Sequence, residues 1–482
     1  MRARDRSRTI GLALTSLLLV LALAFTVESV QTTAGTAVSA FTEYVASRIR
    51  RGLPWVLDPR QLHLDDGPLP IVSLQTYSGV FDALIALLPA AHARVWGGVL
   101  MALVWFGVTA WMVSRAPRAR RATVAIVGLS FLCLEPLLRV AAGLQADALA
   151  AACAALGLAS VLSRRVVTWR AQAWLLAAAL LKPNVIGVLG GIVLADLWID
   201  RRRALVRWTP FALLGAAGLA LLQAHTHGVW LLALRATTQN AFELSRWTFY
   251  LWSYAALLGA PQAAWAVWVL RRHPRDPRAR YGALAVLASV AWQALAMGRH
   301  GSSTHYWLEP VLATTTLLAL GPVTALPRRW CELVHVATPI VIAAFSYVPT
   351  RDVLRDFRTV QRDRDATMAL VAQHCQNDAE HSWISTVSQL ELEGTGKIAA
   401  FEFGLQFAQE RGEWSSEVLR ELLAHPACSC FVHYRDLAEP IPAGKNPREL
   451  TLYDRDLAAF LLEHYEDVAS AYGHHVYRRR TP

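Results

Sequence analysis

The sequence predicts a polytopic α-helical membrane protein with about eleven transmembrane spans and a small C-terminal α/β domain outside the membrane. Of its 482 residues, 54% are hydrophobic and only 17% are charged, whereas soluble proteins carry about 25% charged residues. Short arginine clusters separate long apolar runs, and charges become dense only after residue 349. These observations predict a membrane domain over residues 1–349 and an extracytoplasmic domain over residues 350–482.

The formal net charge of +11 does not indicate nucleic-acid binding. Only three residues are lysine, so arginine carries most of the positive charge. The arginines cluster in the short links between apolar runs, as the positive-inside rule predicts for cytoplasmic loops. The six cysteines have no metal-ligand spacing, and the sequence neither indicates nor excludes a divalent cation. We therefore expect no cofactor and no nucleic-acid partner.

The first apolar run, residues 9–27, follows the basic segment MRARDRSR. A signal peptide has this arrangement, but Glu28-Ser29-Val30 is not a small-x-small cleavage site. We therefore expect an uncleaved first span with its N-terminus in the cytoplasm. Residues 31–69 then form an outer loop that is too long to be a simple connection. Residues 70–91 are interrupted by polar side chains, and we expect them to form a juxtamembrane segment on the outer face.

The alternation of charged links predicts the order of the remaining spans. They are expected at residues 95–114, 122–140, 148–162, 208–223, 249–270, 281–297, 307–320 and 333–348. Residues 171–198 begin and end at basic links and are interrupted by Leu181-Lys182-Pro183-Asn184. This pattern predicts a re-entrant pair of short helices whose tip points toward the outer face. The same topology places the C-terminal domain outside the cytoplasm.

The stretch from Gly298 to Glu309 is polar although it lies between two apolar runs. It contains Arg299 and His305, and it ends in a carboxylate at the head of the next run. Polar groups beside hydrocarbon are costly, and membrane proteins keep them mainly where they face a cavity or a ligand. Irregular backbone at this depth is likewise tolerated only against protein or a water-filled site. We therefore expect this stretch to line a site on the outer side.

The segment after residue 349 mixes helical and strand-like patterns. Helices are expected over residues 363–376, 415–425 and 454–472, and strands over residues 382–389 and 428–433. Cys375, Cys428 and Cys430 lie in this segment, outside the membrane, where disulfides can form. The sequence leaves open a bridge from Cys375 to either of the other two cysteines, and also three free thiols.

Four stretches carry a resemblance to a known family. They are Thr42–Arg48 followed by Gly52-Leu53-Pro54-Trp55, then Gly143–Leu149, Leu181-Lys182-Pro183, and Gly298–Glu309. Together with the layout of most of residues 1–350, they resemble the GT-C superfamily of integral membrane glycosyltransferases. Within it, the chain is most similar to the branch of protein O-mannosyltransferase-like and aminoarabinose-transferase-like enzymes. Gln145 stands where that family commonly has arginine, and Arg299 and His305 replace its lysine and asparagine.

The resemblance implies transfer of a sugar from a polyprenyl-phosphate donor to a lipid, glycan or protein acceptor, in contact with membrane lipids, at the outer face of the cytoplasmic membrane. Residues 31–91 would then form the outer catalytic loop with its juxtamembrane helices. Such transfer needs a general base for the acceptor and a cationic group that stabilises the negative charge on the leaving phosphate. The residues implied are Glu43 and Asp147 as catalytic acids, Lys182, Arg299 and Arg139 at the donor phosphate, and His305, Tyr306 and Glu309 as residues that shape the site.

Each of these residues also has a purely structural interpretation. Glu43 fits a solvated loop acid, Asp147 fits a helix N-cap, and Glu309 fits a structural partner of Arg299. The chain as a whole also fits two other classes of protein. One is a transporter or flippase of a lipid-linked sugar, although such proteins often repeat their span pattern and no repeat is visible here. The other is a non-catalytic assembly protein with a GT-C fold.

Overall fold

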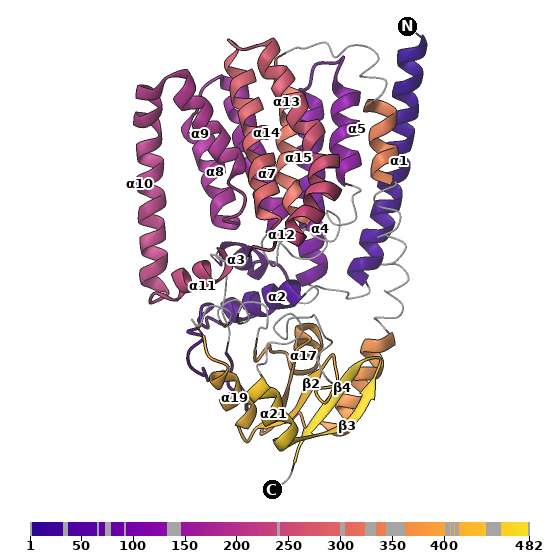
Figure 1. Ribbon diagram of the computed structural model, residues 1–482, viewed down its shortest axis with the longest axis vertical. Helices are drawn as coiled ribbons and strands as arrows, with labels where there is room; N and C mark the ends of the chain where they lie inside the picture. The colour runs from indigo at the N-terminus through magenta and orange to yellow at the C-terminus, as the bar shows by residue number, and fades with distance from the viewer. Residues whose placement is uncertain are drawn as a thin grey trace. The chain divides into compact units, whose positions relative to one another are not determined.

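A computed structural model shows the fold of the chain (Figure 1). It describes residues 2–31, 37–64, 67–72, 79–90, 93–132, 146–238, 242–298, 304–322, 334–343, 362–400, 405, 409, 414–439 and 455–480. The chain divides into two compact units, and each is described by itself below. The first unit comprises residues 1–31, 95–220 and 241–354, and the second comprises residues 32–94, 221–240 and 355–482.

The first unit is built from helices (Figure 1). In chain order they are α1 (Arg2–Gln31), α4 (Ala93–Arg115), α5 (Arg121–Leu132), α7 (Asp147–Arg164), α8 (Trp169–Leu181), α9 (Gly187–Ile199), α10 (Arg201–His225), α12 (Leu244–Tyr250), the π-helix η1 (Leu251–Gly259), α13 (Ala260–Arg272), α14 (Pro277–Ala296), the 3-10 helix η2 (Thr304–Trp307) and α15 (Leu308–Leu320). A further short apolar helix covers Val334–Ala343.

Three helices among the described residues are long and apolar enough to cross a membrane. They are Val95–Arg115, Asp147–Arg164 and Arg201–His225, which is consistent with the expected membrane protein. The expected count of about eleven spans is wrong, because several apolar runs form helices that are too short. The run over residues 171–198, for example, gives α8 and α9 of 13 residues each. A helix of that length is about 20 Å long, and the hydrocarbon core is about 30 Å thick.

The spanning candidates differ sharply in burial. In α7, 72% of the apolar window is buried inside the protein, whereas in α10 only 6% is buried. Alanine occupies most of the buried positions of α7, so neighbouring helices approach it closely. At Gly191 of α9, an added Cβ would lie 2.3 Å from the carbonyl oxygen of Leu284 in α14. The centre of the unit is therefore packed at backbone distance, while the apolar side chains of α10 face outward, as they would toward lipid.

The second unit contains a four-stranded sheet in the order β1-β2-β4-β3 (Figure 1). The strands are β1 (Ser382–Ser385), β2 (Cys428–His433), β3 (Tyr465–Ala471) and β4 (His474–Arg479), and only the β1–β2 pair is parallel. The helices are α2 (Ala37–Arg50), α3 (Val80–Ala86), α11 (Val229–Thr238), α17 (Ser388–Thr395), α19 (Glu417–Ala424) and α21 (Arg455–His464). Residues 362–374 are also helical.

Most of the expected elements of the C-terminal segment are confirmed, but two are corrected. The strand expected over residues 382–389 ends at Ser385, and α17 follows it. The helix expected over residues 454–472 ends at His464, and strand β3 begins at the next residue. The strand forms because it pairs antiparallel with β4. Tyr472 and Gly473 connect the two strands, and both have positive φ angles, as tight hairpin turns require.

The first outer loop contributes to the core of the second unit. Tyr44 of α2 and Ile71 are both 1% exposed, and they belong to the same apolar cluster as Phe431 and Tyr477 of the sheet. The indole Nε1 of Trp414 donates a hydrogen bond to the carbonyl oxygen of Pro59 at 2.6 Å. The sequence groups residues 31–91 with the membrane domain, whereas the structure places residues 32–94 in one unit with the C-terminal segment.

A bulge in β2 determines which cysteines form the disulfide. Ser382 of β1 pairs with Cys428, but the next residue, Trp383, pairs with Cys430, so the register shifts by one residue. This shift turns Cys428 toward the cluster that contains Phe431, and Cys430 toward the cluster that contains Val371. Cys375 is bonded to Cys430, with a Cα–Cα distance of 5.5 Å, and Cys428 is a buried free thiol. The bridge to Cys430 is thus the correct one of the alternatives.

Helix α3 has the reverse of the usual polarity of a surface helix. Its only charged residue, Asp82, is 2% exposed. Its exposed side chains are apolar: Val80, Leu84 and Leu87 are 40%, 39% and 82% exposed. A helix that faces water places charged residues outward, and exposed apolar patches mark contact with protein or membrane. The expected juxtamembrane position of this segment stays a prediction.

Candidate functional site

The candidate site begins at the break between α8 and α9. Pro183 disfavours the helical conformation for the residue before it, and Lys182 has extended backbone with φ −151° and ψ 110°. Helix α8 therefore ends at Leu181, and α9 does not begin until Gly187. The five intervening residues form a turn inside the helical unit, which we call the Lys182 turn. The sequence predicts this break correctly.

Two of the predicted site residues form a buried ion pair. The ammonium group of Lys182 donates a hydrogen bond to the Oδ2 atom of Asp147. The Lys182 side chain is 4% exposed and the Asp147 side chain is 3% exposed. Asp147 is the first residue of α7, where the free N–H groups and the helix dipole stabilise a carboxylate. The pair joins the start of one helix to the break between two others.

Tyr306 and Trp292 hold the Lys182 turn in place. The Lys182 ammonium lies 5.6 Å from the ring centre of Tyr306, within the range of a cation–π interaction. The side-chain amide of Asn184 donates to the Tyr306 hydroxyl at 3.0 Å. The indole of Trp292, on α14, donates to the backbone carbonyl of Asn184 at 2.9 Å. Asn184 and Trp292 were not among the predicted residues, although Asn184 lies two residues from Lys182 in the break itself.

Glu309 binds the start of α9. Glu309 is 1% exposed. The backbone N–H of Val188 donates to Oε1 at 2.8 Å, and the Gln293 amide donates to Oε2 at 2.9 Å. Gly187 permits this approach, because an added Cβ there would lie 2.5 Å from Cα of Ser289 and 3.1 Å from Oε2 of Glu309. Glu309 therefore fixes the second end of the Lys182 turn, and its expected role in shaping a site stays a prediction.

The structure thus brings Asp147, Lys182 and Tyr306 into direct contact, and it places Glu309 on the helix that follows them. Glu43 lies on α2 in the second unit and is half-buried. Arg139 and Arg299 lie outside the described residues, and so does the side chain of His305 in η2. Their proposed roles in catalysis and phosphate binding remain predictions.

A second buried charge in the helical unit was not predicted. Asp196 of α9 is fully buried. It accepts hydrogen bonds from Arg207 at 2.8 Å, from the Trp208 indole at 3.1 Å and from the Tyr281 hydroxyl. These donors come from α10 and α14, so the carboxylate ties three helices together. All three donors bind this one buried carboxylate, and this arrangement indicates a structural role.

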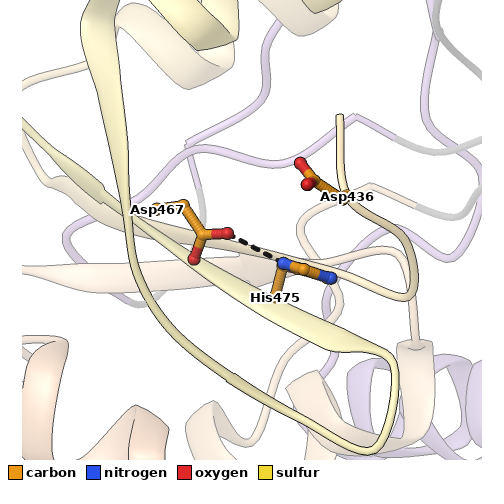
Figure 2. A group of neighbouring side chains, drawn as sticks. All are labelled: Asp436, Asp467 and His475. Carbon is orange, nitrogen blue, oxygen red and sulfur yellow. Dashed lines mark hydrogen bonds and ion pairs between the residues drawn. The ribbon is translucent and has the colours of Figure 1, made fainter. Parts of the chain in front are cut away.

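One group among the described residues has the side chains of a metal site. Asp436, Asp467 and His475 place one ligand atom each within 4.8 Å of the others (Figure 2). His475 Nδ1 and Asp467 Oδ2 are 2.8 Å apart, and Asp436 Oδ1 accepts from the Tyr477 hydroxyl at 3.1 Å. Hydrogen bonds to neighbouring groups account for these side chains, and we assign them no metal. The sequence signals no such site, because the three residues meet only through strand pairing.

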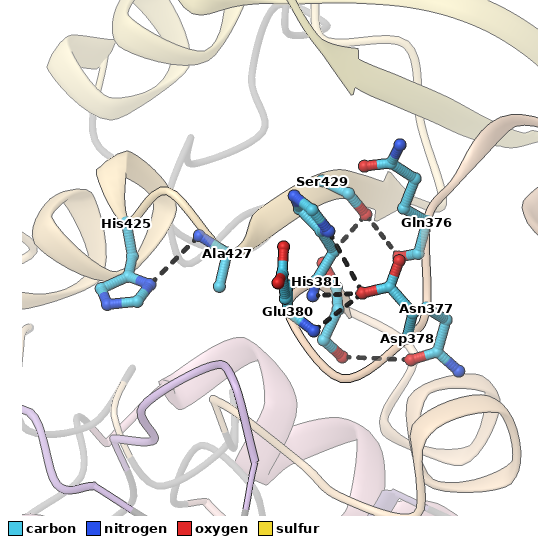
Figure 3. A network of polar contacts seen from close by, with 9 residues as sticks. Gln376, Asn377, Asp378, Glu380, His381, His425, Ala427 and Ser429 are labelled. Carbon is cyan, nitrogen blue, oxygen red and sulfur yellow. Dashed lines mark hydrogen bonds and ion pairs between the residues drawn. The ribbon is translucent and has the colours of Figure 1, made fainter.

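A polar turn precedes β1 in the second unit (Figure 3). Oδ1 of Asp378 accepts the backbone N–H groups of Glu380 and His381, both at 2.8 Å. These N–H groups hold the pKa of Asp378 below its usual range. The Ser429 hydroxyl links the turn to β2, because its oxygen lies within hydrogen-bond distance of the carbonyl oxygens of Gln376 and Ser382, at 2.7 and 2.9 Å. All of these contacts close the turn, so they indicate a structural role.

No protein-family model, no curated protein and no solved structure matches the chain. The function is therefore argued from the geometry of the Lys182 turn and from the resemblance described above.

Proposed function

We propose that this chain is a membrane glycosyltransferase of the GT-C type. It transfers a sugar from a polyprenyl-phosphate donor to a lipid, glycan or protein acceptor at the outer face of the cytoplasmic membrane. The observation that carries the proposal is the contact of Lys182 with Asp147 and Tyr306 at the break between α8 and α9. Ionisable residues buried in membrane domains are expensive and are generally functional.

The cation suits the leaving group of this reaction. As the bond between the sugar and the phosphate breaks, negative charge grows on the phosphate oxygens, and a fixed ammonium group stabilises it. Lysine binds phosphate as a point charge. Asp147, which contacts Lys182, is the first residue of α7, and the N-terminal dipole of that helix favours an anion. Arg139 and Arg299 are the further candidates for phosphate contact.

The carboxylates supply the other half of the chemistry. Glu43 of the first outer loop is the proposed general base, which takes the proton from the acceptor hydroxyl. The acceptor oxygen forms a bond to the anomeric carbon as the bond between that carbon and the phosphate oxygen breaks. The polyprenyl phosphate leaves with the electron pair of that bond. Asp147 is the second proposed acid, and Tyr306, His305 and Glu309 shape the site.

Sugar transfer in membranes tests the proposal. Membranes containing the chain are given radiolabelled polyprenyl-phosphate sugars, and label is followed into lipid, glycan and protein fractions. We expect Lys182→Met and Glu43→Gln each to lower transfer at least about a hundredfold, the usual scale for losing a group that acts in the transition state. Lys397→Met and Glu417→Gln, in the second unit, serve as matched controls that retain transfer.

The same experiment separates the alternative classes. A transporter or flippase would move labelled donor across sealed vesicles without forming a product. An assembly protein would do neither. Transfer that is undiminished in Lys182→Met would show that the assignment of the site is wrong.

A further inference from the structure

We infer that Asp147 acts as a latch that occupies Lys182 in the absence of donor and is displaced from it by the donor phosphate. The inference rests on the proposed function and concerns the regulation of the same site. Its basis is the contact between two oppositely charged side chains at a place where an anionic ligand is expected to bind.

Burial makes direct access to Lys182 impossible in the observed conformation. Its side chain is 4% exposed, and Asp147 contacts the ammonium group from α7. A phosphate that replaces the carboxylate would reach the ammonium group at the position that Asp147 now occupies. Removing one partner from a buried ion pair is strongly unfavourable because the other charge is left uncompensated. Replacing the carboxylate by a phosphate avoids that penalty for Lys182, because one anion is exchanged for another.

The position of Asp147 reduces the cost for the carboxylate as well. Asp147 begins α7, and the first turn of a helix has backbone N–H groups without partners inside the helix. A carboxylate released from Lys182 can accept hydrogen bonds from these groups and is stabilised by the helix dipole. The surroundings thus offer the carboxylate a second place to bind.

The Lys182 turn keeps the cation fixed during the exchange. Asn184 is held on one side by Tyr306 and on the other by Trp292, at 3.0 and 2.9 Å, and Glu309 holds the start of α9 through the N–H of Val188. Because these contacts involve neither Asp147 nor the ammonium group, the turn retains its anchors when the carboxylate leaves. The mobile partner is therefore Asp147.

Solid-state NMR of the full chain in lipid bilayers tests the latch without altering the pair. The chain has only three lysines, Lys182, Lys397 and Lys445, so ¹⁵N labelling of lysine gives three Nζ signals. Lys397→Arg and Lys445→Arg assign them. Aspartate is labelled with ¹³C at the carboxylate, and undecaprenyl phosphate is the probe. Without the lipid we expect Lys182 Nζ to couple to an aspartate carboxylate, and with saturating lipid we expect coupling to ³¹P instead.

Each outcome is decisive. If undecaprenyl phosphate binds while Lys182 keeps its carboxylate coupling and gains none to ³¹P, the latch is wrong and so is the assignment of Lys182 to the donor phosphate, whereas the proposed reaction is then decided by the transfer assay alone. If the chain does not bind undecaprenyl phosphate at all, the latch and the proposed function are both wrong. A second measurement uses Asp147→Asn, which should bind undecaprenyl phosphate about tenfold more tightly than the wild type. The matched control Asp276→Asn, at the start of α14, should leave the affinity unchanged, and equal affinities for wild type and Asp147→Asn would contradict the latch.

Discussion

At the scale of single residues, Glu391 shows how burial changes the chemistry of a side chain. It lies on α17 and is 1% exposed. Its Oε1 atom accepts the backbone N–H of Ala399 at 2.7 Å. Burial raises the pKa of this carboxyl group from 4.5 to about 8, since the hydrogen bonds from Ala399 and Ser385 only partly offset desolvation. The folded protein therefore keeps Glu391 protonated at a pH where an unfolded chain has lost the proton.

This difference predicts a pH-dependent stability of α17. Between about pH 4.5 and pH 8 the unfolded state binds fewer protons than the folded state, so the free energy of unfolding falls as the pH rises, by up to roughly 1.4 kcal/mol per pH unit. Above about pH 8 the slope disappears. Glu391→Gln should remove the dependence, because an amide does not titrate.

Hydrogen exchange of α17 peptides across this pH range, corrected for intrinsic rates, measures the effect. Glu417→Gln, whose wild-type side chain is 62% exposed, is the control and should keep the wild-type slope. A slope that persists in Glu391→Gln would assign the dependence to another group.

Lys182 can be identified from the sequence, but its partners cannot. Its rarity and its place in an apolar run identify it from the sequence as a candidate for function. Its partners cannot be identified in that way, because Asp147 is 35 residues away and Tyr306 is more than a hundred residues away. Long-range packing alone brings these side chains together.

At the scale of elements, short interruptions decide what each apolar run becomes. Pro183 ends α8, and the run over residues 171–198 therefore yields two short helices instead of one span. In the sheet, one extra residue in β2 turns Cys428 and Cys430 toward opposite faces. The break at Pro183 and the bulge in β2 each arise from one or two residues. The bulge, however, can be recognised only when β1 and β2 are paired.

The bulge predicts which cysteine is needed for the disulfide that stabilises the C-terminal segment. The disulfide closes a segment with a sequence separation of 55, and the loss of such a constraint costs roughly 4 kcal/mol in the chain-entropy model. Cys430→Ala should therefore lower the thermal stability of the second unit and make it insensitive to reductant. Cys428→Ala should retain the response to reductant, because the bridge is intact. Thermal unfolding with and without reductant measures both, and a reductant response lost in Cys428→Ala instead would contradict the pairing.

At the scale of the whole molecule, exposed apolar surface indicates where the chain meets lipid. The side chains of α10 face outward over almost its whole length. Helix α3 is apolar outward and buries its only acid. A helix with this polarity is typical of a membrane interface, and we predict that α3 lies at one.

Fluorescence quenching tests this placement. An environment-sensitive dye is attached to Leu87→Cys in the full chain. Any accessible native cysteine is kept from reacting with the dye. In lipid vesicles we expect a blue-shifted emission that nitroxide lipids quench severalfold. Glu380→Cys, in the charged turn before β1 (Figure 3), is the control and should be unquenched, since charged groups avoid hydrocarbon. Equal quenching at the two positions would show that α3 does not lie at the membrane interface.

Properties that depend on neighbours along the chain can be predicted from the sequence. These are the apolar and charged segments, the break at Lys182, the strand over residues 428–433 and several C-terminal helices, because composition and proline act locally. The sequence overestimates the number of spans, because apolar runs do not reveal where a helix stops short. It also extends the last helix through residues that form β3.

Tertiary packing determines which distant groups meet. Strand pairing created β3 and selected Cys430 for the disulfide. The packing of α7, α9, α14 and α15 placed Asp147 on Lys182 and gave Glu309 the N–H of Val188 as its partner. The physical reason is the same in each case. A buried charge or an open strand edge must find a partner, and the fold determines which partner lies within reach.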